Sequence, residues 1–431
     1  MAQAKSIKTR LIVMNILQWA VWGAYLTSMG SFLFRAGFAD KIGIAYAMQG
    51  IVSIFMPALM GIVADKLIAP EKTLGLCHAI SGSAMLGAGL YAMLTGAGMS
   101  FAVWFSLYSI GAAFYMPTIA LSNSVAFKIL EDNGYDSVSA FPPIRVFGTV
   151  GFIAAMLTVN FLKNSEGLQF QLTHDQFILS GSLALVLFLY CFTLLPSCKE
   201  TAEEANDNKT FAQRMGLDAF KLFKAKDMAI FFIFSMMLGV SLQITNGFAN
   251  PFITSFTDLP EYAGSWWAQN ANALISISQI SETLCILLIP FALKKLGIKK
   301  VMLIAMFAWV LRFGLFGAGN PGSGVWMFIL SCIVYGVAFD FFNISGSLYV
   351  NQKTDVSIRN SAQGLFMLMT NGIGATVGTL CAQAVVNHFV NNAAEPSWST
   401  AWYIFAAYAL VVAVAFIFAF KDPGTADGAC K

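Results

Sequence analysis

Four ionisable residues lie inside long apolar runs of this sequence: Arg145, Glu282, Arg312 and Asp340. Each run has the roughly 20 residues that a helix needs to cross the hydrocarbon of a bilayer. A charge at that depth costs about 2.5 to 3.5 kcal/mol even on lenient insertion scales, so such residues are candidates for binding or transport. The alternative is structural, either a buried ion pair or an arginine whose head reaches the interface.

For Arg312 and His78 we predict a structural role. Arg312 stands roughly 20 Å from the start of its run at 1.5 Å per residue, which lets its head reach the outer interface. His78 follows Cys77 and has no second histidine or carboxylate at helical spacing. We therefore expect a packed, hydrogen-bonded histidine and no metal or proton relay there.

Carboxamides accompany these charges in two consecutive apolar runs. Gln243 and Asn246 are three residues apart, as are Gln279 and Glu282, so each pair shares one helix face. A short connection makes the two helices antiparallel neighbours, and the polar faces are expected to look into one cavity. Polar residues at this spacing also join membrane helices to each other, which is the structural alternative.

Aromatic residues complete two of these faces. Tyr335 and Phe339 are four residues apart, and Asp340 follows directly. In another run, the i, i+4 and i+7 positions carry a guanidinium, a hydroxyl and an aromatic ring in Arg145, Thr149 and Phe152. A carboxamide offers the donor and acceptor that a nucleobase edge needs, an aromatic ring stacks, and a carboxylate accepts hydrogen bonds from sugar hydroxyls. A nucleoside meets all three demands, while a hexose would use the amides and carboxylates equally well.

The amino-acid composition indicates that these helices lie in a lipid bilayer. Of the 431 residues, 58% are hydrophobic and 11% are charged, against about 45 to 50% and about a quarter in soluble domains. So few charges cannot coat a soluble globule of this size. The net charge of +3 without a long basic block argues against nucleic-acid binding, and seven scattered cysteines argue against a disulfide frame or a metal site.

The apolar runs predict an all-α membrane protein with twelve transmembrane helices. We expect them near residues 11–33, 43–64, 72–95, 99–127, 138–162, 176–195, 228–250, 265–293, 299–319, 325–350, 359–390 and 400–420. With both termini cytoplasmic, all but five of the 25 basic residues fall on the cytoplasmic side. The exceptions are Arg35, Lys41 and Lys163 outside and the two arginines within spans. This positive-inside bias supports an even number of spans with that orientation.

The longest charged stretch divides the chain into two six-helix halves. We expect an N-terminal half at 1–195, a cytoplasmic linker at 196–227 and a C-terminal half with a short tail at 228–431. Between the second and third spans, Gly61 to Lys66 reads G-x-x-x-D-K, a partial match to the cytoplasmic loop motif of the major facilitator transporters.

Four longer strings are more specific. They are Phe141-Pro142-Pro143-Ile144-Arg145-Val146-Phe147-Gly148-Thr149, Leu242-Gln243-Ile244-Thr245-Asn246, Ile277-Ser278-Gln279-Ile280-Ser281-Glu282-Thr283 and Tyr335-Gly336-Val337-Ala338-Phe339-Asp340-Phe341-Phe342-Asn343. These strings closely resemble the bacterial nucleoside:proton symporter family of the major facilitator superfamily, and the likeness runs essentially from end to end. The resemblance implies that base and ribose are held by Arg145, Thr149, Phe152, Gln243, Asn246, Gln279, Glu282, Tyr335, Phe339 and Asp340.

The resemblance also implies a secondary transporter that imports nucleosides such as uridine or adenosine with protons by alternating access. Arginine stays protonated, so we expect proton coupling at Asp340, with Glu282 mainly contacting the ligand and Arg145 as a fixed positive charge. A sugar or polyol symporter of the same superfamily is the alternative. The chain carries no G-x-S-x-G, H-E-x-x-H or P-loop motif, so we expect neither an enzyme nor an ATP-driven pump. We expect no cofactor, a monomer, lipids as surroundings and a multi-pass protein of the bacterial inner membrane.

Overall fold

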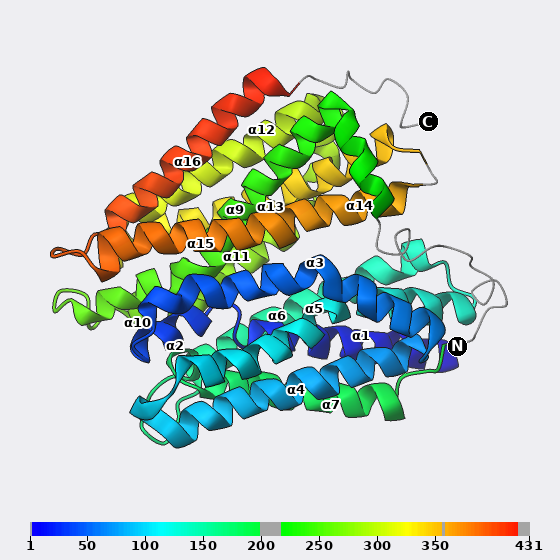
Figure 1. Ribbon diagram of the computed structural model, residues 1–431, viewed down its shortest axis with the longest axis horizontal. Helices are drawn as coiled ribbons and strands as arrows, with labels where there is room; N and C mark the ends of the chain where they lie inside the picture. Colours follow the sequence, from blue (N-terminus) through cyan, green and yellow to red (C-terminus); the bar gives the residue numbers. More distant parts are fainter. Residues whose placement is uncertain (1, 199–216, 356–357, 421–431) are drawn as a thin grey trace. The chain divides into compact units, whose positions relative to one another are not determined.

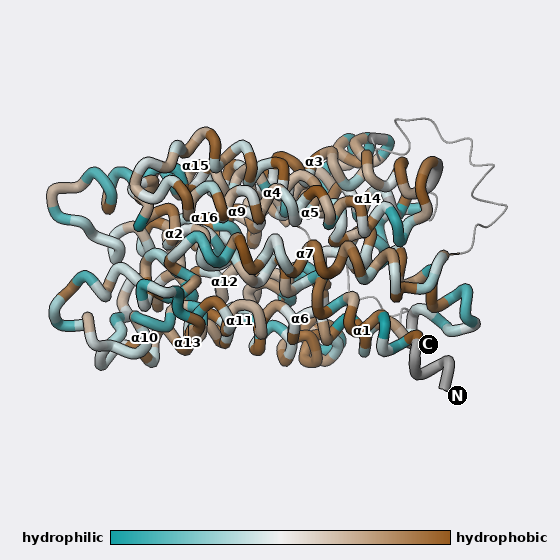
Figure 2. Tube along the Cα trace, turned by 90° about the horizontal axis from the view of Figure 1, so that it is seen from below, coloured by the Kyte–Doolittle hydropathy of each residue, from teal (hydrophilic) through white to brown (hydrophobic). Residues whose placement is uncertain are grey.

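The computed structural model describes residues 2–198, 217–355 and 358–420. These residues form helices, and their one β-bridge joins Lys163 and Gln169 in a loop. The predicted all-α class is confirmed. Lipid offers the backbone no hydrogen-bond partners, and a helix satisfies its backbone hydrogen bonds internally. Brown apolar stretches run along the helices in Figure 2, and teal polar residues gather at the connections.

The described residues group into two compact units, 2–39 with 51–198, and 40–50 with 217–355 and 358–420. Helix α3 (Ile42–Lys66) contributes to both. The other helices of the first unit are α1 (Ala2–Gly23), α2 (Met29–Arg35), α4 (Pro70–Thr95), α5 (Phe101–Asp132), α6 (Ser137–Phe161) and α7 (Asp175–Thr193). The second unit contains α9 (Lys226–Ser255), α10 (Trp266–Gln269), α11 (Ala271–Ile286), α12 (Ile289–Ala318), α13 (Val325–Lys353), α14 (Arg359–Met367), the π-helical η8 (Leu368–Gly374) and η9 (Asn387–Asn391), α15 (Ala375–Val386) and α16 (Trp398–Ala419).

Within the described residues, ten helical segments are long and apolar enough to cross a membrane. They are α3, α4, α5, α6, α7, α9, α12, α13, the continuous segment from α14 to η9, and α16. Eight of them begin and end within five residues of predicted spans. The segment that contains α9 ends at Asp258, eight residues beyond its predicted span, and α12 begins at Ile289, ten residues before its own.

The two remaining predicted spans are interrupted. The span predicted at 11–33 is divided into α1 and α2 by turns at residues 24–28. The span predicted at 265–293 is divided into α10, the 16-residue α11 and the first turns of α12. Helix α12 itself turns sharply at Gly297, whose φ of 77° is accessible to glycine at little cost.

Each unit repeats one packing pattern. In the first unit, α1 packs on α6, and α4 packs on α5 and α7. In the second, α9 packs on η8 and α15, and α12 packs on α13 and α16. Figure 1 shows α4 beside α7 and α12 beside α16. Helices in corresponding chain positions therefore make corresponding contacts, as expected for a transporter built from structural repeats.

Candidate functional site

Helix α13 presents the predicted aromatic and acidic residues together. The rings of Tyr335 and Phe339 are stacked, with centroids 5.8 Å apart and planes at 8°. Tyr335 and Asp340 are buried, whereas Phe339 is half-buried. Oδ2 of Asp340 has no hydrogen-bond partner among the residues that the structure describes. A buried carboxyl oxygen without a donor is costly unless a ligand, water or proton supplies one.

A close approach of α11 and α13 brings the second acidic residue to this face. A Cβ at Gly336 would lie 2.6 Å from the backbone carbonyl of Ser281, so only glycine permits this distance. The Ser281 hydroxyl also donates to the backbone oxygen of Ile333 on α13. As a result, the Tyr335 side chain lies near Gln279 and Glu282 of α11, as well as near Asp340 on its own helix.

The predicted amide pair lies on α9, in the same unit. Nδ2 of Asn246 donates to Oε1 of Gln243 at 3.3 Å. Gln243 is buried and Asn246 is half-buried. One helical turn later, Nδ2 of Asn250 donates to Oδ1 of Asn272 at 2.7 Å, which joins α9 to α11. The amide pair on α9 thus lies one helical turn from a side-chain hydrogen bond that joins α9 to α11.

Three of the predicted residues belong to α6 in the first unit. Arg145 and Thr149 are half-buried and Phe152 is buried. The guanidinium carbon of Arg145 lies 3.9 Å from the ring centroid of Trp19 on α1, and the ring of Trp22 contacts Phe152 edge to face, at 6.3 Å. A Cβ at Gly151 would overlap the backbone of Ile16, which explains how α1 comes so close.

Trp19 and Trp22 were not predicted from the sequence. Their spacing of three residues in an apolar run is a signal for one shared face, but nothing in that spacing indicates which distant helix the face meets. Figure 1 shows α1 beside α6, the helix that carries Arg145. The structure therefore adds two aromatic rings to the predicted set.

His78 is packed and hydrogen-bonded, as predicted. Its Nε2 lies 2.7 Å from Oε1 of Gln18, and Nε2 of Gln18 donates to the Thr118 hydroxyl at 2.7 Å. The Tyr115 hydroxyl donates to the backbone oxygen of Gln18 at 2.8 Å. The three side chains of Gln18, His78 and Thr118 are fully buried. They form a polar contact between α1, α4 and α5 inside the first unit.

The prediction that Arg312 reaches the outer interface is wrong. Its side chain is 0% exposed, and Nη1 donates to the backbone oxygen of Ser331 on α13 at 2.6 Å. The guanidinium carbon lies 4.7 Å from the ring centroid of Tyr335. The prediction used only the position of Arg312 along its helix. The direction of the side chain depends on which neighbours surround α12.

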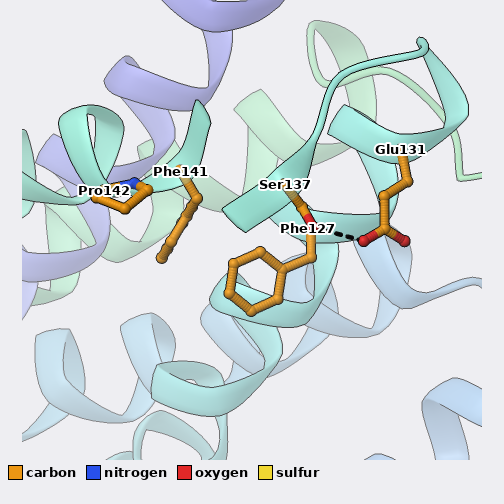
Figure 3. Close-up of a pocket in the computed structure, with 5 residues that line it drawn as sticks. All are labelled: Phe127, Glu131, Ser137, Phe141 and Pro142. Atoms are coloured by element: carbon orange, nitrogen blue, oxygen red, sulfur yellow. Dashed lines mark hydrogen bonds between the residues drawn. The ribbon is translucent and has the colours of Figure 1, made fainter. Parts of the chain in front are cut away.

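The described surface also contains a pocket of about 340 Å³ between α5 and α6. Figure 3 shows Phe127, Phe141 and Pro142 lining it, with the Ser137 hydroxyl donating to Glu131. None of the ten predicted substrate residues lines this pocket. Within the described part of the chain, no three His, Cys, Asp or Glu side chains gather as metal ligands would.

The G-x-x-x-D-K motif lies at the end of α3. The side chains of Asp65 and Lys66 are outside the described residues. Of the predicted linker at 196–227, residues 199–216 are likewise outside them, and Leu217–Lys224 forms a short 3-10 segment.

Long apolar helices in two similarly packed units, with polar side chains inside them, define a multi-pass membrane transporter. The chain matches the family described as Nucleoside H+ symporter over residues 5–425, and it belongs to that family. The resemblance seen in the sequence is therefore confirmed, and with it the expectation of nucleoside:proton symport.

Named relatives agree with this assignment. The chain is 46% identical over 419 residues to the xanthosine permease of Escherichia coli K12, covering 96% of each chain. It is 44% identical over 421 residues to the nucleoside permease NupG of the same organism, again covering 96% of each. A crystal structure of a mutant NupG superposes with a TM-score of 0.89 at 43% identity, covering 96% of this chain and 100% of that one.

A more distant structure agrees on the fold. The D-xylose-proton symporter has a TM-score of 0.68 at 14% identity and covers 97% of this chain and 99% of its own. At that identity the likeness concerns the fold alone.

Proposed function

We propose that this protein imports nucleosides together with protons by alternating access between its two halves. The observation that carries the proposal is the cluster of Gln279, Tyr335, Phe339 and Asp340 on two helices held together at Gly336. The cluster combines an amide, stacked aromatic rings and a buried carboxyl within apolar helices. These groups supply base recognition, stacking and a site for a proton or a hydroxyl.

We assign the nucleobase to the carboxamides of Gln243, Asn246 and Gln279. Phe152 and Phe339 contact the faces of the substrate rings, and Tyr335 extends the aromatic surface behind Phe339. Thr149 and Arg145 donate hydrogen bonds from the first unit. Partial exposure supports this assignment, because a substrate can reach side chains that are not sealed in the interior. The half-buried residues of the set are Arg145, Thr149, Asn246, Gln279, Glu282 and Phe339.

We assign proton coupling to Asp340, Glu282 and Arg145. Asp340 is the proton site, because it is the more deeply buried carboxyl and one of its oxygens lacks a donor within the described residues. Glu282 accepts hydrogen bonds from the ribose. Arg145 is the fixed charge of the first unit.

The proposed architecture has twelve spans, with α1 and α2 forming the first and α10 and α11 the eighth. Residues 1–195 and 228–431 form the two halves, joined by the linker at 196–227. Both termini are cytoplasmic, and the protein is a monomer in the bacterial inner membrane. The repeated packing pattern of the two units supports the division into halves. The relatives are permeases, which supports a transporter that is not an enzyme.

Uptake of labelled uridine and adenosine into proteoliposomes tests the proposal. We expect accumulation above the equilibrium level only when an inward proton gradient is imposed, and its collapse when a protonophore is added. Unlabelled uridine should compete, whereas free ribose and xylose should not. Accumulation of labelled xylose, or inhibition by free ribose at millimolar concentration, would instead support the sugar symporter.

A further inference from the structure

Trp22 on α1 lies between a predicted substrate residue and the interior of the first unit. Its ring centroid is 6.3 Å from that of Phe152 on α6, with the ring planes at 85°. Its centroid is also 6.0 Å from that of Tyr115 on α5, with the planes at 43°. Both distances fall within the range of favourable aromatic pairs. The indole therefore packs against rings from two neighbouring helices.

The surroundings hold this indole in place. A Cβ at Gly23 would overlap the backbone of Phe152, so α1 and α6 approach each other closely at the residue that follows Trp22. The Tyr115 ring is itself fixed, because its hydroxyl donates to the backbone oxygen of Gln18 at 2.8 Å. A ring that is fixed before a substrate arrives loses little conformational entropy on binding. The packing of Trp22 thus favours a ring that is ready to receive a ligand.

Part of the indole surface is still accessible. Trp22 is half-buried, whereas Phe152 is only 6% exposed and Tyr115 is fully buried. Of these three rings, Trp22 therefore offers the accessible surface. The same face of α1 carries Trp19, whose ring contacts the guanidinium of Arg145. This face of α1 is thus turned toward the predicted substrate residues of α6.

The nearly perpendicular rings of Trp22 and Phe152 match the shape of a nucleoside. In a nucleoside, the plane of the base is turned steeply against the mean plane of the ribose. A base that stacks on the indole of Trp22 can therefore present its ribose ring to the face of Phe152. A hexose has a single ring, and it would leave one of the two aromatic surfaces uncovered.

We propose that Trp22 is a further substrate-contacting residue, whose indole stacks on the nucleobase while Phe152 faces the ribose, and that the size of the indole favours a purine over a pyrimidine. This inference rests on the proposed function, since it assigns a role within the same nucleoside site. The apolar area removed from water grows with the overlap of two stacked rings. A bicyclic purine covers both rings of an indole, whereas a pyrimidine covers only one.

Binding of adenosine and of uridine to the purified protein in detergent tests the proposal. Trp22→Ala should weaken adenosine binding by roughly 5- to 150-fold, the range expected for the loss of one stacked base. Trp22→Phe keeps a ring but not the bicyclic area, so the ratio of the adenosine Kd to the uridine Kd should rise by about 3- to 10-fold. A role in folding alone would leave this ratio at the parent value. An unchanged adenosine Kd in Trp22→Ala, or a parent-like ratio in Trp22→Phe, overturns the proposal.

Tryptophan fluorescence provides a second measurement where Trp22→Ala folds poorly. A base stacked on an indole quenches its emission, so saturating adenosine should quench the parent protein and quench Trp22→Phe distinctly less. Trp326, which is 57% exposed in the first turn of α13, supplies the control, because Trp326→Phe should keep the Kd ratio and the adenosine-dependent quenching of the parent. Equal quenching in all three proteins would contradict the stacking contact.

The parent protein separates the two levels of the argument. If it binds neither adenosine nor uridine, the proposed function fails, and the role of Trp22 fails with it. If it binds both nucleosides and the two Trp22 variants keep its Kd values, only the role of Trp22 fails.

Discussion

The guanidinium carbon of Arg145 lies 3.9 Å from the centroid of the Trp19 ring. This cation–π contact joins α6 to α1 and presses the head of Arg145 against an aromatic face. Nε1 of Trp19 has no hydrogen-bond partner among the described residues, so the ring acts through its face. Trp19 thereby restricts the directions in which Arg145 can donate hydrogen bonds.

We expect Trp19→Ala to weaken uridine binding by roughly 2- to 30-fold, the range that corresponds to a cation–π contact of about 0.5 to 2 kcal/mol. Without the ring, Arg145 loses the aromatic face that restricts its orientation. Trp19→Phe keeps an aromatic face and should retain most of the affinity. Binding to the purified protein in detergent measures both variants. Parent-like affinity in Trp19→Ala would show that Arg145 is oriented by other contacts.

The base-reading amides give a second prediction. Loss of a buried amide that binds a base edge costs about 1 to 3 kcal/mol, or roughly 5- to 150-fold in affinity. Gln243→Ala and Asn246→Ala should each weaken uridine binding within that range while membrane expression stays at the parent level. Gln352, an exposed amide on α13, provides the control, because Gln352→Ala should bind uridine like the parent. If all three variants bind alike, the amides do not read the base.

The sequence predicts the chemically important residues better than it predicts their neighbours. Charge is so costly in lipid that Arg145, Glu282, Arg312 and Asp340 are conspicuous by residue type alone. The spacing of Gln243 and Asn246 likewise predicts their shared face, since it depends only on helix geometry. Contacts such as that of Arg145 with Trp19 depend on which helices pack together, and residues more than 120 positions apart leave no local pattern.

Helix ends show the same limit. Ten predicted spans agree with the structure because hydropathy and length decide them. The break after α11 occurs at the apolar residues Leu287 and Leu288, and the break between α1 and α2 begins with Ala24, Tyr25 and Leu26. The hydropathy pattern therefore does not mark where either break starts. The prediction for the Arg312 side chain was wrong for a related reason. The position of a residue along a helix does not indicate whether its side chain faces a neighbouring helix.

The close approach at Gly336 gives a third prediction. In Gly336→Ala the new methyl group would lie 2.6 Å from the backbone of Ser281, so α11 and α13 must separate. Overpacking of this kind costs roughly 1 to 3 kcal/mol. We expect a lower melting temperature together with weaker uridine binding, because Gln279 and Glu282 move away from Tyr335.

Gly314 on α12 is the matched control for this substitution. A Cβ there meets nothing within 4 Å, and alanine has the higher helix propensity, by about 0.5 to 1 kcal/mol. Gly314→Ala should therefore keep uridine binding and leave the melting temperature equal or higher. Equal loss of binding in both variants would show that the effect does not come from the contact between α11 and α13.

The last prediction separates binding from energy coupling. Asp340→Asn keeps the size and hydrogen-bonding capacity of the side chain but cannot take up and release a proton. This variant should therefore still exchange labelled for unlabelled uridine across the proteoliposome membrane, while it no longer concentrates uridine under an inward proton gradient. Glu282→Gln weakens the acceptor for the ribose, so its main effect should be on affinity. If Asp340→Asn still concentrates uridine and Glu282→Gln does not, the two roles are reversed; if both variants concentrate it, the coupling proton binds elsewhere.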